Sequence, residues 1–467
     1  MSGFVAGVVV VLVLVPLVHS ASHALWANRT IYQLLTDRFA RPLSNPDPFA
    51  ACGDLNDYCG GTFNGVAEHL DYIAGLGFDA IWISPIVENT RGGYHGYWMK
   101  DLFAVSPEFG GQSQMQALIA AAHARNMFVM LDVVANHVGP VGNNFSSIRP
   151  FNDASYYHSC HNCPSGCSIN NFACFTTEIQ TCRLDNLPDL NQSDPTVFNS
   201  FLHFAQTVSL VFGFDGLRID TSPEVDPSFW RAFVRASGLW AIGEVFTSDV
   251  ACVAAYARAE SGALSYPLYF AIRDVFANGA AMTALKSTID SYSANNIDLS
   301  VLATFLGNHD NPRFMAGSSV DALKSAAVAV FFLPGVPTWY YGDEALFDNS
   351  QTSREPFWTT AFDPNNIALA DWLTLVVATR KSLALSTQSF SIVHVDQDTF
   401  FFVRGTVAIV ALTNQQTIPR LKRTLRTGFA PGRRLCNVFW PDVDCITIGN
   451  NGLVSIYLDN GEAKVYL

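Results

Sequence analysis

Charged side chains are scarce in this sequence, at 14% of its 467 residues, and cations are scarcer than anions. The chain has 27 Lys and Arg against 40 Asp and Glu, a formal net charge of −13, and no basic run that stands out. These absences argue against nucleic acids and anionic membrane surfaces as partners. Hydrophobic residues make up 49% of the chain and aromatic residues 13%, which suits a large core and a neutral ligand with stackable faces.

Long apolar runs are also missing, with one exception near the amino terminus. Residues 5–18 form an apolar core of signal-peptide length, and the small residues Ser20, Ala21 and Ser22 follow it. No Lys or Arg precedes this run, and the alternative, a signal anchor, needs roughly 20 apolar residues. We therefore expect a signal peptide over residues 1–21 and a secreted, extracellular protein without membrane attachment after cleavage.

Ten cysteines and three N-glycosylation sequons, at Asn28, Asn144 and Asn191, agree with secretion. Two close pairs could each close a small loop: Cys52 with Cys59, and Cys436 with Cys445. Five of the remaining cysteines form a cluster in the sequence, and a sixth, Cys252, makes their number even: Cys160, Cys163, Cys167, Cys174 and Cys182, with Cys252. The cluster resembles a string of metal ligands, but no CxxC pair recurs at zinc-finger spacing. We favour disulfides and leave the pairing within the cluster open.

Apolar, strand-like runs alternate with amphipathic stretches along most of the chain. The runs cover residues 31–37, 79–85, 127–137, 214–220, 239–245, 264–270, 301–310 and 337–344. Eight strands that are buried on both faces and alternate with helices predict a parallel (β/α)8 TIM barrel. We place this barrel at residues 22–138 and 192–382.

Two segments interrupt the alternation. Residues 139–191 are rich in Asn, Ser, Cys and Pro and predict an irregular excursion, a domain B, after the third strand. Residues 383–467 contain strand-like runs without helices between them and predict an antiparallel β-sandwich domain. The expected fold class is therefore α/β, a TIM barrel with these two additions.

Some strand-like runs contain or end in charged residues. Arg218 and Asp220 lie two residues apart in GLRID, so on a strand their side chains point to the same side. Asp220, Glu244 and Asp310 end or follow the fourth, fifth and seventh runs, and chemistry in a β/α barrel collects at the carboxyl ends of its strands. A helix cap or a buried salt bridge would explain one of these carboxylates, but three on one rim indicate a site.

Converging carboxylates suit the hydrolysis of glycosidic bonds. In the retaining form, one carboxylate attacks the anomeric carbon and another protonates the leaving oxygen, from roughly 5–5.5 Å apart. Asp220 and Glu244 are separated by one strand–helix unit and can supply this gap. We expect Arg218 to hold Asp220 ionised while Glu244 keeps its proton.

Four segments resemble the signature motifs of the α-amylase family, in their usual order and spacing: DVVANHVG, GLRID, GEV and FLGNHDNPRF. Other stretches, such as CGGTFNGVAEHLDYIAGLGFDAIWISP and GGYHGYWMKD, are similar to secreted fungal-type α-amylases. The resemblance covers about residues 24–342 and, more loosely, the carboxyl-terminal domain. It implies a monomeric, endo-acting hydrolase of internal α-1,4-glucosidic bonds in starch, glycogen and maltooligosaccharides.

The resemblance also implies roles for single residues. Asp220 would be the nucleophile and Glu244 the general acid/base. Asp310 would help to distort the sugar and stabilise the oxocarbenium-like state, and Tyr97 would stack beneath that sugar. The implied substrate contacts are His95, Tyr97, Trp98, His137, Arg218, Glu224, His309 and Arg354.

A structural calcium ion is implied where the excursion meets the barrel. Its ligands would be Asn136 and Asp189 through side-chain oxygens, and Glu224 through its backbone carbonyl. The family's usual calcium glutamate has no clean counterpart, because Gln180 stands at its place with Glu178 nearby as a further candidate. Plain loop capping is the alternative for Asn136 and Asp189.

The chain departs from the family pattern in three further places. Cys252 lacks its usual partner before the seventh strand, and Ser350 replaces an aspartate four residues before Arg354. Pro223 and Glu224 stand where the pattern has a Lys-His pair that donates hydrogen bonds on the leaving-group side. Because proline has no donor and glutamate offers an acceptor, we expect a weakened leaving-group subsite with the metal site preserved.

Two other functions stay open. The signature motifs do not separate an endo-acting amylase from an α-glucosidase or an α-glucan transglycosylase of the same family. A non-catalytic, membrane-anchored relative is also permitted by the amino-terminal apolar run, although silent relatives tend to lose the carboxylates that this chain keeps.

Overall fold

The computed structural model describes residues 23–467 apart from residues 165, 351, 417–419 and 460. The expected signal peptide at residues 1–21 lies outside the described residues. Within the described part of the chain, no helix has the length and apolar character needed to cross a membrane.

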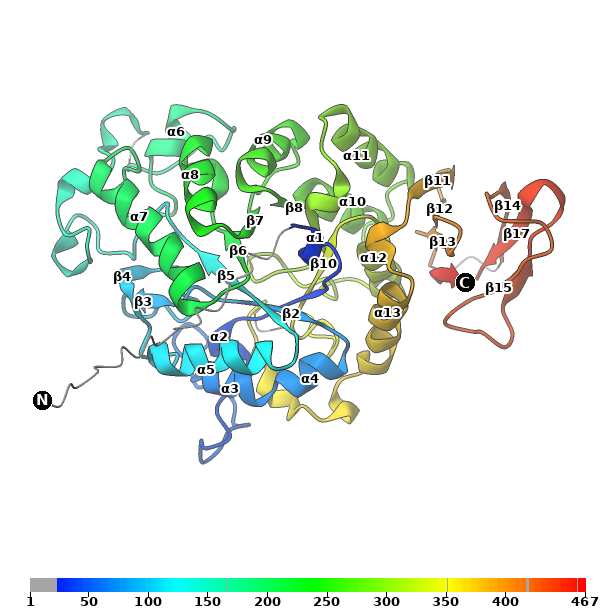
Figure 1. Cartoon of the computed structure of the whole chain (residues 1–467), viewed down its shortest axis with the longest axis horizontal. Helices are drawn as coiled ribbons and strands as arrows, with labels where there is room; N and C mark the ends of the chain where they lie inside the picture. The colour runs from blue at the N-terminus through cyan, green and yellow to red at the C-terminus, as the bar shows by residue number, and fades with distance from the viewer. Residues whose placement is uncertain (1–22, 165, 351, 417–419, 460) are drawn as a thin grey trace, which may run out of the picture.

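Eight parallel strands close into a barrel at the centre of the fold (Figure 1). Around the barrel they are β1 (Ile31–Gln33), β2 (Ala80–Ile83), β5 (Phe128–Val133), β6 (Gly216–Ile219), β7 (Trp240–Gly243), β8 (Ala263–Leu264), β9 (Leu302–Phe305) and β10 (Val336–Tyr340). Almost all their residues are buried, because helices cover the outside and side chains fill the inside. The TIM barrel predicted from the sequence is confirmed.

The longer helices are α5 (Gly111–His123), α7 (Pro195–Thr207), α8 (Pro227–Ser237), α9 (Val250–Glu260), α10 (Tyr266–Phe276), α11 (Thr283–Ala294), α12 (Val320–Phe332) and α13 (Ala370–Ser382). Shorter ones are α1 (His23–Trp26), α2 (Thr36–Phe39), α3 (Phe63–Glu68), α4 (Leu70–Gly75) and α6 (Thr177–Thr181). Helices α7 and α8 each begin with an Asp-Pro pair: Asp194 and Asp226 accept backbone N–H groups of the first turn. The proline that follows needs no donor in that turn, so both pairs fix where a helix starts.

The sixth apolar run, residues 264–270, is predicted above as a strand, and this is largely wrong. Only Ala263–Leu264 form strand β8, and α10 begins at Tyr266. Pro267 lies in the first turn of α10, where its missing N–H costs nothing. The run is apolar because this part of α10 is buried, and periodicity alone does not distinguish a short buried helix from a buried strand.

An irregular segment joins β5 to α7 and lies beside the barrel (Figure 1). It contains α6 and short 3-10 turns at Phe145–Ser147, Ala154–Tyr156 and Cys160–Asn162, and a hairpin of β3 (Val87–Asn89) and β4 (Met99–Val105) touches it through an Asp101–Arg149 bridge. Its disulfides are Cys160–Cys167, Cys163–Cys182 and Cys174–Cys252, the last of which ties it to α9. We keep residues 139–191 as the proposed extent of domain B.

Disulfide pairing accounts for all ten cysteines. Cys52–Cys59 and Cys436–Cys445 close the two small loops expected from the sequence, and no free cysteine remains among the described residues. The cluster is therefore a disulfide framework and holds no thiolate for a metal. Cys252, which lacks the partner usual in the family pattern, pairs with Cys174 of the excursion instead.

The carboxyl-terminal region is built from antiparallel sheets. One sheet has the order β11 (Phe390–Val395), β12 (Thr399–Arg404), β13 (Ala408–Thr413) and β18 (Lys464–Tyr466), and two smaller sheets pair β14 (Leu421–Arg426) with β17 (Leu453–Leu458) and β15 (Arg434–Cys436) with β16 (Cys445–Thr447). One face of β12 and β13 packs on the barrel side, and the other shares a core with β14, β15 and β17. This arrangement confirms the antiparallel β-sandwich.

Candidate active site

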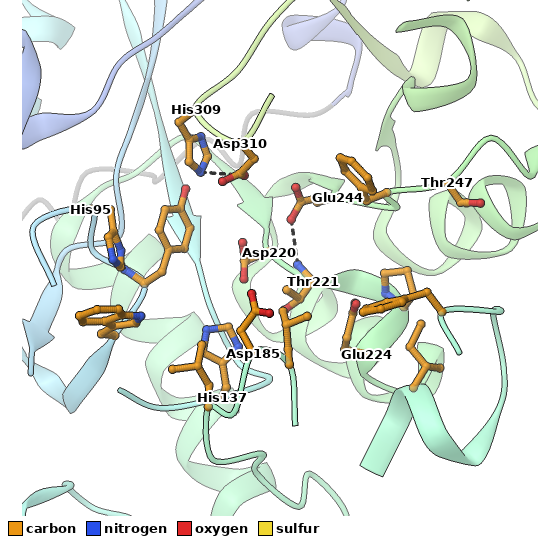
Figure 2. A pocket seen from close by; sticks show the side chains of 18 of the residues that line it. His95, His137, Asp185, Asp220, Thr221, Glu224, Glu244, Thr247, His309 and Asp310 are labelled. Atoms are coloured by element: carbon orange, nitrogen blue, oxygen red, sulfur yellow. Dashed lines mark hydrogen bonds and ion pairs between the residues drawn. The ribbon is translucent and has the colours of Figure 1, made fainter. Parts of the chain in front are cut away.

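A pocket of about 680 Å³ opens at the carboxyl ends of the barrel strands. Figure 2 shows Asp220, Glu244 and Asp310 around one central space, with His137 and Glu224 along its edge. These residues come from different strand–loop junctions, and the barrel brings them together because all its strands end on one rim. The predicted site residues that line the pocket are His95, Tyr97, Trp98, His137, Asp220, Glu224, Glu244, His309, Asp310 and Arg354.

Arg218 lies behind the pocket and contacts three carboxylates. Its Nη1 is 2.7 Å from Asp220 Oδ1 and 2.8 Å from Asp132 Oδ1, and its Nη2 is 2.7 Å from Glu244 Oε2. The guanidinium is fully buried, so water screens none of these contacts. The expected Arg218–Asp220 pair is therefore present, but Arg218 does not single out Asp220.

The electrostatic balance at Asp220 differs from the expectation. Burial raises the pKa of Asp220 well above its ordinary value, Arg218 opposes this, and the neighbouring Glu244 and Asp132 raise it further. We expected the ion pair to dominate and hold Asp220 ionised. Loss of hydration and repulsion between carboxylates outweigh it, because one cation serves three anions.

Asp132 was missed by the sequence analysis. It lies on β5 in register with Arg218 on β6, which explains their contact. Its second oxygen accepts hydrogen bonds from Tyr97 Oη at 2.7 Å and Trp82 Nε1 at 2.9 Å. Burial raises the pKa of Asp132 to about 6, with Arg218 opposing. An aspartate inside the apolar run FVMLDVV was the available signal, since a buried strand carries such a residue only with a partner.

Glu244 is held from two sides. The backbone N–H of Thr221 donates to Glu244 Oε2 at 3.2 Å, and the Tyr266 hydroxyl donates to Oε1 at 3.2 Å. Thr221 has a φ of 49°, a left-handed conformation that is costly for a β-branched residue and persists only where its surroundings enforce it. Tyr266 in turn accepts from Asn308 at 2.8 Å. Neither Tyr266 nor Asn308 was predicted, the former because its run was taken as a strand.

Asp310 projects into the pocket from the loop after β9 and is more exposed than the other two carboxylates. His309 Nε2 lies 3.1 Å from its Oδ2, and Arg354 Nη2 lies 3.0 Å from its Oδ1. On the far side of the imidazole, Gln33 Nε2 lies 3.1 Å from His309 Nδ1. Gln33, also missed, therefore fixes the orientation of His309, while Arg354 stays in place although Ser350 replaces the family's aspartate.

The three histidines of the pocket are poor bases. Burial lowers the pKa of His137 to about 4, and burial together with the positive charge of Arg354 lowers the pKa of His95 and of His309 well below the ordinary value. At neutral pH they therefore act as uncharged hydrogen-bonding groups. The ring of Tyr97 stacks on His309, with centroids 5.0 Å apart and planes 10° apart.

Comparison with known proteins agrees with this geometry. The model of the α-amylase catalytic domain matches residues 33–371. An α-amylase of Saccharomycopsis fibuligera is 32% identical over 95% of this chain and 92% of its own length. Alpha-amylase 1 of Lipomyces kononenkoae is 37% identical over 74% of this chain, which spans 57% of that longer protein. The chain belongs to the α-amylase family.

Solved structures of α-amylases share the fold over nearly the whole chain. An α-amylase from Malbranchea cinnamomea has a TM-score of 0.88 at 32% identity and covers 96% of this chain and 97% of its own. The α-amylase of Geobacillus thermoleovorans, solved with acarbose, has a TM-score of 0.81 at 28% identity, covering 94% and 98%. The α-amylase fold therefore includes the carboxyl-terminal sheets as well as the barrel.

Two buried oxygen atoms show whether the residues implied as calcium ligands fit the ion. Asn136 Oδ1 and Asp189 Oδ1 are both buried, and neither has a hydrogen-bond partner in the described part of the chain. An antiparallel bridge between His137 and Asp189 holds the two segments together. Two unpaired, hard oxygen donors fit calcium and do not fit loop capping, which would give them backbone N–H partners. His158, 2.6 Å from the second oxygen of Asp189, was missed.

The other two candidate calcium ligands, Glu178 and Glu224, lie in different surroundings. The Glu178 side chain accepts backbone N–H groups of Asn170 and Asn171 at 2.7 and 2.9 Å, so it caps a loop of the excursion. Glu224 turns its buried carboxylate toward the pocket, where no described residue forms a hydrogen bond with its Oε2. Among the described residues, no group of three or more His, Cys, Asp or Glu side chains could hold a metal. A calcium site here would consist of amide, carbonyl and single carboxylate oxygens.

Proposed function

We propose that this protein is a secreted, endo-acting α-amylase that cleaves internal α-1,4-glucosidic bonds in starch, glycogen and maltooligosaccharides with retention of configuration. The observation that carries the proposal is the shared contact of Asp220 and Glu244 with one guanidinium, 2.7 Å from each. A retaining glycosidase needs two carboxyl groups roughly 5–5.5 Å apart, and a guanidinium that touches both keeps them close.

The reaction follows from the positions of three carboxyl groups. Asp220 attacks the anomeric carbon in its ionised form, which the contact with Arg218 stabilises, as the bond to the leaving sugar breaks. Glu244 gives its proton to the departing oxygen. Asp310, held by His309 and Arg354, faces the positive charge that develops on the sugar ring. Water then gives a proton to Glu244, and its oxygen displaces Asp220 to restore the α configuration.

The pocket wall binds and orients the sugar. The Tyr97 ring, fixed through its hydroxyl by Asp132, offers a stacking face, and Trp98 adds a second aromatic surface. His95, His137 and His309 supply neutral hydrogen-bonding groups. A neutral polyol is bound well by such groups, because no charge has to be desolvated.

We also propose a structural calcium ion held by Asn136, Asp189 and the backbone carbonyl of Glu224. Its chemistry is structural: it joins the excursion to the strand ends that carry the site. The two unpaired buried oxygens support it. Secretion and glycosylation are supported by five disulfides and by the exposure of the sequon residues Asn28 and Asn144.

The product profile on soluble starch tests the proposal. A mixture of maltooligosaccharides early in the reaction is expected, with the viscosity of the solution falling faster than reducing ends appear. Glucose as the sole product would instead indicate an α-glucosidase, and longer or cyclic products a transglycosylase. Absence of any action on α-glucans by correctly folded protein would leave the non-catalytic alternative.

A further inference from the structure

A groove of about 420 Å³ lies on the carboxyl-terminal sheets, apart from the active-site pocket. Most of its lining comes from β14, β16 and β17, with Tyr466 of β18 and loop residues beside them, and it includes Thr424, Ile446, Thr447, Leu453, Ser455 and Tyr457. In Figure 1, β14, β15 and β17 lie at the far right, beyond β11, β12 and β13 and away from the barrel. The groove therefore belongs to the outer layer of the β-sandwich.

Strand pairing shows which side chains face the groove. Lys422 pairs with Tyr457 and Arg426 with Leu453, and directly paired residues of antiparallel strands project to the same face. Tyr457 and Leu453 line the groove, so both cations stand on its side of the sheet. Arg434 pairs with Thr447, another lining residue, across β15 and β16.

On this acidic protein, cations gather beside the groove, whose own lining contains one charged residue, Asp444. Residues 420–434 contain six Lys and Arg and no Asp or Glu, and the judgement above that no basic run stands out is wrong for this segment. Arg423 pairs with Asp396 and Asp398. The exposed cations around the groove form no salt bridge with any described carboxylate: Arg420, Lys422, Arg426 and Arg434.

The acid that lines the groove is already neutralised by a neighbouring cation. Asp444, which lines the groove, lies 2.9 Å from Lys464 and accepts a hydrogen bond from the Tyr466 hydroxyl at 2.9 Å. Among the described residues, no carboxylate at salt-bridge distance therefore balances the exposed cations at this surface. Such a cluster repels itself and gains free energy when an anion binds.

The groove also offers groups that suit a sugar. The Thr424 and Ser455 hydroxyls lie 2.8 Å apart on its floor, where they can exchange hydrogen bonds with a polyol. The Arg420 guanidinium and the Lys422 ammonium lie 4.8 and 5.5 Å from the centre of the Tyr457 ring. The Tyr457 ring thus contacts both cations and holds them in position, so it is not free to stack on a nucleobase.

We propose that this groove binds α-glucan chains that carry phosphate monoesters. Guanidinium and ammonium groups bind phosphate strongly, and the hydroxyls of the floor bind the neighbouring glucose units. A flat bilayer cannot enter a concave groove, and the covered ring disfavours nucleic acid. This inference rests on the proposed function, because the same polymer would then be held at the groove and cut at the pocket.

Retention in native gels that contain glucan tests the inference. The gels contain either a phosphorylated amylopectin or the same amylopectin after phosphatase treatment, at low ionic strength and 4 °C. The chain should be held about tenfold more tightly by the phosphorylated form, since several exposed ion pairs each add a modest amount. In 1 M salt, where the Debye length is about 3 Å, this preference should vanish.

Two triple variants of equal charge separate the groove from general electrostatics. Lys422→Gln/Arg426→Gln/Arg434→Gln should lose the preference for phosphorylated glucan. Arg231→Gln/Arg235→Gln/Arg258→Gln, which removes three exposed cations from α8 and α9, should keep it. Both variants should hydrolyse a short, uncharged maltooligosaccharide at the rate of the parent chain, which also reports on folding.

Three results would overturn the inference. Equal retention by the two amylopectins, or an equal loss in both triple variants, would remove the groove as a phosphate site. Stronger competition by DNA or by vesicles with anionic lipid than by free phosphorylated glucan would assign the groove to another polyanion. Failure of the parent chain to hydrolyse any α-glucan would refute the proposed function, while the retention result would still be readable.

Discussion

Replacement of Glu260 by Gln tests a buried acid directly behind the two central carboxylates. Glu260 ends α9 and is 0% exposed. A Cβ atom placed on Gly243 would lie 1.7 Å from Glu260 Oε2 and 2.6 Å from Ser222 Oγ, so the carboxyl group fills the space between these two residues. Burial raises the pKa of Glu260 well above its ordinary value, and Ser222 and Arg218 offset only part of this.

The sign and size of the effect follow from proton linkage. In the unfolded chain a glutamate has a pKa of about 4.3, so above that pH the unfolded state releases a proton that the folded state keeps. The free energy of unfolding should therefore fall, relative to Glu260→Gln, by about 1.4 kcal/mol for each pH unit while folded Glu260 stays protonated. As the pH rises from 5 to 7, the variant should therefore gain stability on the parent chain, by at most about 2.7 kcal/mol.

Urea unfolding at pH 5, 6 and 7 measures this difference. Glu108→Gln is the matched control, because it makes the same chemical change at an exposed glutamate. The reasoning is refuted if the curves for the parent chain and Glu260→Gln stay parallel from pH 5 to pH 7. It is also refuted if Glu108→Gln shows the same pH-dependent gain.

Three other predictions concern the site and its metal. Pro223→Lys with Glu224→His should restore hydrogen-bond donors on the leaving-group side. Because each hydrogen bond contributes about 0.5–1.5 kcal/mol, kcat/KM should rise several-fold on maltotriose but much less on starch. An equal change on both substrates would contradict this prediction. Asp132→Asn should lower the pKa of Asp220, because the charge of Asp132 raises it. The acidic limb of the pH profile of kcat/KM should therefore move to lower pH. An acidic limb at the same pH in the variant would contradict an effect of Asp132 on Asp220. Chelation should lower the melting temperature before activity is lost, and re-added calcium should restore it; an unchanged melting curve in protein shown by elemental analysis to be calcium-free would remove the metal.

Much of the fold could be predicted because barrel strands are short apolar runs whose charged residues fall at one end. Asp220, Glu244 and Asp310 were found in this way, and the structure brings them into one pocket. The sixth strand could not be located, since Ala263–Leu264 is too short to leave a pattern and the aromatic residues that follow it belong to α10.

The partners of the central residues were harder to predict, because contacts across strands depend on register. Asp132 contacts Arg218 only because β5 and β6 pair in that register. Gln33 contacts His309 although the two residues lie 276 positions apart in the sequence. Disulfide pairing in the excursion was open for the same reason. The spacing of Cys174 does not indicate that α9 carries its partner Cys252.

The expected direction of the pKa shift at Asp220 was wrong, because the expectation depended on a single ion pair. From GLRID alone, Arg218 had one neighbour, and an ionised Asp220 followed. The structure adds Asp132 and Glu244 to the same guanidinium and buries the group. A cation shared among three carboxylates stabilises each charge less, and burial then decides the direction of the shift.

The central claim is that Asp220 forms a covalent bond with the sugar during cleavage. A fluorinated maltosyl fluoride, whose glycosyl–enzyme hydrolyses slowly, should trap this intermediate, and mass spectrometry of the digested protein locates it. We predict one added fluorinated maltosyl group per chain, on the peptide that contains Asp220, and none in Asp220→Asn. An adduct on any other residue, or release of the β-anomer from starch without a trapped intermediate, would contradict the account.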